Sequence, residues 1–232
     1  MSNRSPRSPF AKRCLCLGAV LLLSVGCGHT AVTRTLVETF GKGVGVDAIN
    51  LNPALSYLRV SSDGREALLV LGYSDPHPLG DIETWYSASG EVFKLQNGRL
   101  LSTTGLKLDW REVRYASLPS WAALFKNPSA RFERERDEMP GHRFGIRETV
   151  EISSVSPPRN ANLVGLSPLS LRWFEERVVA SPRPLSSARY GVAQRDDGKP
   201  PLVVYGEQCL RPDFCISWQT WPADPPRAAN AP

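Results

Sequence analysis

Histidine, methionine and cysteine are scarce in this chain, which has 3 His, 2 Met and 5 Cys among its 232 residues. The histidines, His29, His77 and His142, stand far apart in separate flexible stretches, whereas a zinc site needs four ligands brought together. The sequence also lacks Gly-x-Ser-x-Gly, His-Glu-x-x-His, phosphate-loop and paired Cys-x-x-Cys motifs. We therefore predict no metal ligand, no catalytic residue and no cofactor other than a covalent lipid.

An excess of charge of one sign is also missing once the N-terminus is set aside. Of the 28 Lys and Arg residues, four lie before residue 14, which leaves 24 cations against 23 Asp and Glu in the rest of the chain. A nucleic-acid-binding protein usually carries a basic face or stripe. The near-neutral balance gives no support to a nucleic-acid partner.

Long apolar runs are absent apart from one, which extends from Cys14 to Val25. It holds about a dozen residues, fewer than the roughly 20 that a membrane-spanning helix needs. Arg4, Arg7, Lys12 and Arg13 precede it. A basic segment followed by a short apolar run is typical of a cleaved export signal, and we predict a signal peptide over residues 1–26.

The residues that end this run, Leu23-Ser24-Val25-Gly26-Cys27, resemble the lipobox of bacterial lipoproteins. The resemblance implies a diacylglyceryl thioether and an N-acyl chain, such as palmitate, on Cys27. Several acyl chains together hold a protein firmly on a bilayer. Gly28, in place of Asp, implies the outer membrane by the sorting rule of enteric lipoproteins. Ser24 and Gly26 also fit ordinary secretory cleavage, so a soluble secreted protein stays open as the alternative.

Cysteine parity agrees with a lipidated Cys27. If Cys27 is acylated, Cys209 and Cys215 are the remaining pair of the mature chain, and an exported protein seldom keeps an odd free thiol. Pro212-Asp213 between them suits the centre of a hairpin turn. We predict a Cys209–Cys215 disulfide that contributes on the order of 2 kcal/mol by closing a small loop.

Apolar and polar residues alternate from Tyr57 onward, which predicts an all-β domain over residues 51–222 with one or two short helices. Asn97-Gly98 between two apolar runs predicts a tight hairpin, because both residues accept a positive φ. We expect an antiparallel meander that forms a curved or barrel-like sheet. Residues 27–50 are predicted as a lipidated tether, and residues 223–232, rich in Pro and Ala, as a disordered tail.

Other segments receive individual predictions. Residues 106–115 fit a helix or a strand equally well, and residues 118–125 predict a short helix with a proline near its start. The charge run 131–138 predicts a solvated strand or arm. The expected strands are 57–60, 66–73, 82–88, 92–95, 100–104, 147–155, 171–179, 202–205 and 214–221, with a proline-rich connection over 181–187.

Aromatic residues are the candidates for contact with sugar rings, which stack on exposed flat faces. We consider Trp85, Tyr86, Trp110 and Tyr115 for this role, while core packing is the alternative for each ring. Close carboxylates, as at Glu175-Glu176 and within 131–138, leave a carboxylate-dependent glycan-modifying enzyme open as a second hypothesis. Nearby arginines favour surface ion pairs for these acids instead.

The stretch from Asn52 to Tyr115 resembles the YjbF or GfcB family of lipoproteins associated with exopolysaccharide and group 4 capsule production. The likeness rests on the order of its features, which are the lipobox, Pro53-Ala54-Leu55, Ala67 to Leu71, Glu83 to Ala88, Asn97-Gly98-Arg99, Thr104-Gly105-Leu106 and Trp110. The Cys209–Cys215 bridge is not a feature of this resemblance.

The resemblance implies an all-β, periplasm-facing lipoprotein of the outer membrane that has no enzymatic step. Such a protein would be an accessory factor in exopolysaccharide or capsule assembly or export, with polysaccharide or export-machinery proteins as partners. A purely structural envelope lipoprotein is the remaining alternative.

Overall fold

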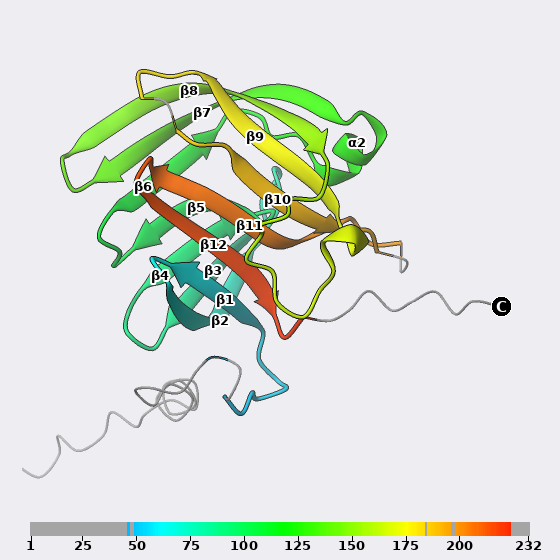
Figure 1. Cartoon of the computed structure of the whole chain (residues 1–232). Helices are drawn as coiled ribbons and strands as arrows, with labels where there is room; N and C mark the ends of the chain where they lie inside the picture. The colour runs from blue at the N-terminus through cyan, green and yellow to red at the C-terminus, as the bar shows by residue number, and fades with distance from the viewer. Residues whose placement is uncertain (1–45, 47–48, 184, 196–197, 224–232) are drawn as a thin grey trace, which may run out of the picture. The chain divides into compact units, whose positions relative to one another are not determined.

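The computed structural model describes residues 46, 49–183, 185–195 and 198–223. The predicted signal peptide, Cys27, most of the predicted tether and most of the predicted tail lie outside the described residues. The described residues form a 12-stranded sheet, the short helix α2 and the 3-10 helix η3 (Figure 1). Their bounds are β1 Tyr57–Ser62, β2 Arg65–Asp75, β3 Ile82–Ser87, β4 Val92–Gln96, β5 Arg99–Thr104, β6 Asp109–Tyr115, α2 Trp121–Lys126, β7 Ser129–Met139, β8 Arg143–Val155, η3 Pro168–Ser170, β9 Arg172–Ala180, β10 Ala188–Ala193, β11 Leu202–Arg211 and β12 Phe214–Trp221.

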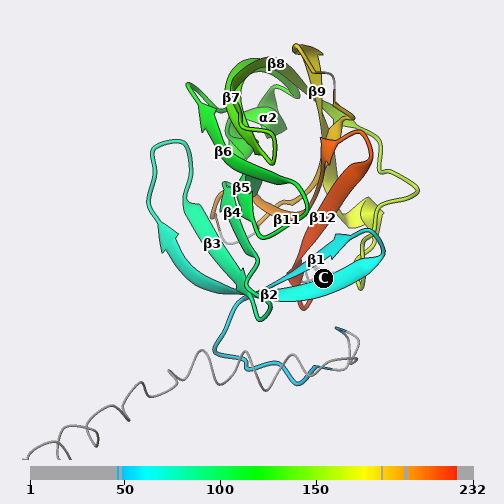
Figure 2. The same cartoon turned by 90° about the vertical axis from the view of Figure 1, so that its left-hand side faces the viewer.

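The sheet is an antiparallel meander in which nearly every strand pairs with its neighbours in the chain. The strand order is β5-β4-β3-β2-β1-β12-β11-β10-β9-β8-β7-β6. One pairing joins the two ends of the domain, since β1 runs beside β12 with Tyr57 opposite Trp221 and Ser62 opposite Ile216 (Figure 2). The first and last strands of the chain thus hold the sheet together.

The two outer strands of this order, β5 and β6, also meet, so that the sheet is barrel-like and nearly closed. The backbone N–H of Trp110 donates to Thr103 Oγ1 at 3.1 Å, and Tyr115 Oη donates to the Leu100 carbonyl at 3.5 Å. These bonds use side chains, and no backbone ladder joins β5 to β6 among the described strands. The predicted curved or barrel-like meander is confirmed.

The main core fills the inside of the curved sheet, because alternate residues of each strand point inward. Its members come from both halves of the meander and include Leu58, Leu69, Phe93, Val150 and Phe174. The helix α2 packs at one end. Ser120 caps it by accepting from the Ala123 N–H at 3.2 Å, Trp121 and Leu124 are buried, and Trp121 Nε1 donates to the Asn97 carbonyl at 2.8 Å.

Two smaller apolar clusters cover parts of the outer face. Residues 49–55 lie on β1 and β2, where Leu51 and Leu55 contact the cluster of Tyr57, Leu68 and Val70. The long connection before β9 covers β9 and β11 in the same way, and its Val164 exchanges two hydrogen bonds with the Gln219 side chain at 2.9 and 2.7 Å. None of the helices in the described ranges has the length and apolar content that crossing a bilayer requires.

Most of the strand and turn predictions are confirmed. Asn97 and Gly98 both have positive φ, 49° and 76°, in the β4–β5 hairpin. Residues 109–115 form a strand, which decides the ambiguity over 106–115, and the predicted short helix is α2. Cys209 and Cys215 face each other in the β11–β12 hairpin and form the predicted disulfide.

One strand was missed, and one expectation is wrong in part. Strand β10 was not predicted, and it contains Gly191, whose missing side chain leaves room for Leu171 and Trp173. The charge run 131–138 is a strand, but only one of its faces is solvated. The other face is buried and carries Phe132, Arg134, Arg136 and Glu138.

Candidate functional site

Buried charge on neighbouring strands marks the most unusual part of the interior. Arg134 and Arg136 on β7 and Glu148 on β8 point inward, with only 4%, 0% and 2% of their surface exposed. Their positions follow from strand alternation, because Phe132 and Val150 lie on the same inward faces. An isolated charge costs several kcal/mol to bury, so each of these groups needs a partner.

Glu148 is the shared partner of both arginines. Arg134 Nε donates to Glu148 Oε2 at 2.7 Å, and Arg136 Nε lies 3.0 Å from Glu148 Oε1. Ser181 Oγ also donates to Glu148 Oε1 at 3.1 Å. Glu138 pairs with Arg136 as well and lies 3.3 Å from Arg143 Nε. Burial lowers the pKa of Arg136, whereas the pKa of Arg134 is raised by the charge of Glu148 against the opposing effect of burial.

Aromatic rings complete the surroundings of these guanidinium groups. The ring of Trp110 contacts both of them, with its centre 5.1 Å from Arg134 Cζ and 4.9 Å from Arg136 Cζ. Such contacts contribute about 0.5–2 kcal/mol each. Trp110 is therefore a core residue that supports the charged strands.

A second buried ion pair lies on the inner side of β5 and β9. Arg99 Nε donates to Glu176 Oε1 at 2.6 Å, and both side chains are buried. Tyr190 Oη donates to Glu176 Oε2 at 3.3 Å. The Arg99 guanidinium lies 3.8 Å from the centre of the Trp121 ring, and its two Nη atoms have no hydrogen-bond partner within the described residues. The inward-facing arginines Arg99, Arg134 and Arg136 are balanced by Glu138, Glu148 and Glu176.

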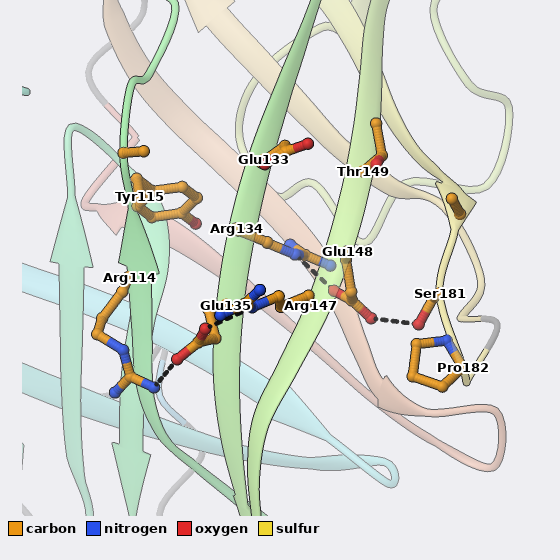
Figure 3. A pocket seen from close by; sticks show the side chains of 12 residues that line it. Arg114, Tyr115, Glu133, Arg134, Glu135, Arg147, Glu148, Thr149, Ser181 and Pro182 are labelled. Atoms are coloured by element: carbon orange, nitrogen blue, oxygen red, sulfur yellow. Dashed lines mark hydrogen bonds and ion pairs between the residues drawn. The ribbon is translucent and has the colours of Figure 1, made fainter.

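A cleft of about 880 Å³ opens beside the Arg134–Glu148 pair. Strands β6, β7 and β8 and the segment that follows β9 supply its walls (Figure 3). Its lining residues are Arg114, Tyr115, Ala116, Glu133, Arg134, Glu135, Arg147, Glu148, Thr149, Ala180, Ser181 and Pro182. Ligand sites in proteins commonly have volumes of about 300–1,000 Å³, so this cleft is large enough for a small molecule or a few sugar units.

The exposed rim of the cleft carries a separate charge network, visible in Figure 3 as the contacts of Glu135. Arg114 Nη2 donates to Glu135 Oε1 at 2.7 Å, and Arg147 Nε donates to Glu135 Oε2 at 3.2 Å. Both hydrogen bonds lower the pKa of Glu135, and the bond from Arg114 has the larger effect. Hydrogen bonding to Arg114 likewise lowers the pKa of Asp137. Both carboxylates are therefore ionised at neutral pH.

Tyr115 is the aromatic member of the lining. Burial raises its pKa to about 12, so its hydroxyl stays protonated at neutral pH, and it donates to the Leu100 carbonyl. The Ser181 hydroxyl, the guanidinium groups and the carboxylates give the cleft closely spaced donors and acceptors. Such a lining suits an uncharged polyhydroxyl ligand, because each sugar hydroxyl can both donate and accept.

The four aromatic residues predicted for sugar contact do not share one groove. Trp85 and Trp110 are buried in the core, with 4% and 0% of their surface exposed, and offer no free face. Tyr115 lines the cleft, while Tyr86 lies on the outer face of β3. Contact with glycan stays a prediction for the two tyrosines alone.

The charged residues of the cleft were missed as site residues. Arg134 and Arg136 belong to the run 131–138, in which the charges fall on both faces of the strand. Glu148 alternates with Ile146 and Val150 and so shares their buried face of the strand. The pairing of Glu148 with two arginines was not visible in either segment by itself. The described residues contain no cluster of three or more His, Cys, Asp or Glu that could hold a metal ion.

Comparisons with known proteins agree with this fold. The family model described as group 4 capsule polysaccharide lipoprotein gfcB, YjbF matches residues 45–183, a range that includes every element of the cleft. Among solved structures, the hypothetical lipoprotein YmcC from Escherichia coli K12 is similar with a TM-score of 0.52 and 17% identity, over 85% of this chain and 91% of that chain. At this identity the likeness concerns the fold alone. A search of curated proteins found no significant match.

Proposed function

Since this chain belongs to the YjbF family of group 4 capsule polysaccharide lipoproteins, we propose that it binds polysaccharide in the cleft between β6, β7 and β8. In this role it is a non-enzymatic accessory factor in the assembly or export of capsule or exopolysaccharide. Family membership supports the role in capsule assembly. The ligand and the absence of an enzymatic step are our own inferences from the cleft.

One observation carries the proposal. The cleft has a volume of about 880 Å³, and ion pairs hold its polar lining groups in place. Glu135 on the rim accepts from Arg114 and Arg147, so the exposed lining groups hold one another in place before a ligand arrives. Behind them, the buried Arg134–Glu148 pair supports the wall. Preorganised polar groups cost less entropy on binding than mobile surface side chains. Opposite charges are balanced, which favours an uncharged stretch of saccharide over a strongly charged ligand.

The same ion pairs argue against a glycosidase. Glycoside cleavage commonly uses one carboxylic acid with a raised pKa and one ionised carboxylate. In this cleft the pKa of Glu135 is lowered, and Glu148 already accepts from Arg134 and Ser181 and contacts Arg136. Glu135 is therefore not suited to protonate a leaving sugar, and the oxygens of Glu148 are occupied by their partners. These contacts support a binding role.

We place this protein at the outer membrane, held by lipid on Cys27 and facing the periplasm. The motif that ends in Cys27 and the following Gly28 support this location. Export-machinery proteins are the second class of partner that this location allows.

A bulky residue at the cleft wall tests the proposal. Ala116→Trp fills space in the cleft from an exposed position, and Ala122→Trp is its matched control on the exposed side of α2. Full-length lipoprotein in detergent is titrated with fragments of the host's own capsular polysaccharide by calorimetry. We expect Ala116→Trp to weaken binding by about tenfold or more, which is about 1.4 kcal/mol, and Ala122→Trp to bind as the unaltered protein does.

The same variants, produced from the chromosome, should separate the alternatives. Surface polysaccharide should fall with Ala116→Trp and stay unchanged with Ala122→Trp, at equal protein levels on immunoblots. Failure of the unaltered, folded protein to bind any fragment would contradict the proposal and favour a structural envelope lipoprotein. Fragments that become shorter during incubation with the protein would show an enzyme instead.

A further inference from the structure

The outer face of β2, β3 and β4 carries a second feature, which lies away from the cleft. Tyr73 pairs with Thr84, and Thr84 pairs with Lys94, so these three residues form one row across the sheet. Tyr86 lies two residues beyond Thr84 on the same face, and Trp85 between them points into the core. Tyr73 and Tyr86, with Thr84 and Lys94 beside them, are called the tyrosine platform below.

The two tyrosine rings of the platform lie against each other on the surface. Their centroids are 6.4 Å apart and their planes are inclined by 49°. Tyr73 is 45% exposed, whereas Tyr86 is partly buried. A pair of inclined rings presents a shallow aromatic surface that is wider than either ring alone.

Gly72 explains how Tyr86 can lie so close to the neighbouring strand. It occupies the irregularity in the β2–β3 pairing between Leu71 and Tyr73. A Cβ atom at this position would lie 2.5 Å from Tyr86 Cε2 and 2.8 Å from its Cδ2, closer than carbon atoms approach each other. The absence of a side chain at Gly72 lets the Tyr86 ring rest on the backbone of β2, which fixes the ring in place.

The chain covers the apolar part of this face and leaves the platform open. Val70 is opposite Tyr86 in the strand register and is buried in the cluster formed with residues 49–55. Beyond Val70 the covering ends. Residues 72–75 are exposed, Tyr86 and Lys94 are partly exposed, and Thr84 is buried beneath them. The charges of Lys94 and Asp75 act on the Tyr73 phenol with opposite sign, so the platform has both a cation and an anion close by.

We propose that the tyrosine platform is a second polysaccharide contact, on which the apolar face of a neutral hexose ring stacks. Aromatic rings with polar groups at their edge suit a sugar, which has an apolar C–H face and a polar rim. The charges of Lys94 and Asp75 offset each other, so the platform lacks the basic surplus that attracts an anionic membrane surface. The described part of this face has no large aliphatic side chain that is exposed beside the tyrosines. This inference rests on the proposed function of the cleft.

Because the domain has two sites, its affinity should depend on the length of the polysaccharide. A polysaccharide long enough to reach both the cleft and the platform gains affinity from the second contact, because that contact forms at high effective concentration. A fragment of two or three sugars can occupy only one site at a time. The platform should therefore matter for long chains and be dispensable for short fragments bound in the cleft.

The test compares Tyr73→Ala with Phe144→Ala, which removes another exposed ring from a different part of the surface, on β8. Full-length lipoprotein in detergent is titrated with long capsular polysaccharide and with its short fragments. We expect Tyr73→Ala to weaken binding of the long chains about tenfold and to leave short-fragment binding unchanged. Phe144→Ala should change neither, and Ala116→Trp should weaken both.

Two outcomes would overturn the platform without affecting the cleft. In the first, Tyr73→Ala binds long chains as the unaltered protein does while Ala116→Trp is impaired. In the second, Tyr73→Ala lowers the binding of the unlipidated Cys27→Ser protein to phosphatidylethanolamine and phosphatidylglycerol vesicles, which would make the platform a membrane contact. If the unaltered protein binds neither long nor short saccharides, the proposed function itself is wrong.

Discussion

The inner face of the sheet differs between its two sides. On β1, β2 and β4 the inward residues are apolar, as Leu58, Leu69 and Leu95 show. On β7 and β8 the same face carries Arg134 and Glu148 among apolar neighbours. Both sides are equally well buried, so the difference lies in the chemistry of the buried groups and not in their access to water.

This difference has an energetic meaning. Burying a leucine side chain contributes about 1.5–3 kcal/mol to stability. A buried ion pair contributes little in net terms, because the attraction only offsets the loss of hydration, and apolar residues of similar size often serve stability as well or better. The charged side of the sheet is thus not explained by stability alone. We take the adjacent cleft, whose wall these charges form, as the reason for them.

The largest expected effect comes from removing the carboxylate that both arginines share. Glu148→Gln leaves the guanidinium groups of Arg134 and Arg136 buried without their common counter-charge. Breaking one partner out of such a pair typically costs about 3–5 kcal/mol, and we expect a loss of this size. Unfolding in urea, followed by tryptophan fluorescence, measures it.

Glu151→Gln on the same strand is the matched control for Glu148→Gln. Glu151 pairs with Arg131 at 3.8 Å, and the two side chains are 43% and 63% exposed. An exposed pair contributes about 0–1 kcal/mol, so this change should be nearly silent. Equal losses for the two variants would show that the buried charges are no more important to folding than the surface ones.

The second prediction asks whether apolar residues can replace a buried ion pair of the interior, namely Arg99 on β5 with Glu176 on β9. In a Tyr190→Phe background, Arg99→Met alone leaves Glu176 buried and unpaired and should cost about 3–5 kcal/mol. Adding Glu176→Leu removes the remaining charge, and the double variant should recover this loss or be more stable than its background by about 1–4 kcal/mol. A double-mutant cycle on urea unfolding gives the coupling energy. A double variant that stays as unstable as Arg99→Met would mean that the pair itself stabilises the fold.

The apolar side of the sheet was accessible from the sequence, whereas the charged side was not. Alternation and the Asn97-Gly98 turn are local features, and they predicted strands β1 to β5 closely. The same holds for the Cys209–Cys215 disulfide, because both cysteines belong to one hairpin. Local pattern fails for Arg134 and Arg136, since charges on both faces of a strand are normally read as exposure to solvent.

Arg134 finds its partner across one hairpin, since it is opposite Glu148 in the β7–β8 register. The other buried pair joins distant parts of the chain. Arg99 and Glu176 are separated by 77 residues, and β1 pairs with β12 from the other end of the domain. No local pattern states which strands will be neighbours in a meander. The tyrosine platform has the same origin, because Tyr73 and Tyr86 meet through the register of β2 and β3 after the irregularity at Gly72.

The smallest expected effect is a loss of stability in alkali, which reports on the cleft wall directly. The pKa of Tyr115 is about 12 in the folded protein, because of burial, against about 10 for an unfolded tyrosine. The folded state therefore holds this proton more tightly. The resulting stabilisation is complete below pH 10 and is lost as the pH rises from 10 to 12.

Tyr115→Phe should flatten this part of the stability curve, measured by urea unfolding at a series of pH values. The phenolate absorbance at 295 nm supplies the control, since the difference between the two proteins should appear only near pH 12. A difference that appears near pH 10 while the protein is still folded would mean that water reaches Tyr115 freely. The two sides of the sheet would then differ in their access to water as well as in the chemistry of their buried groups.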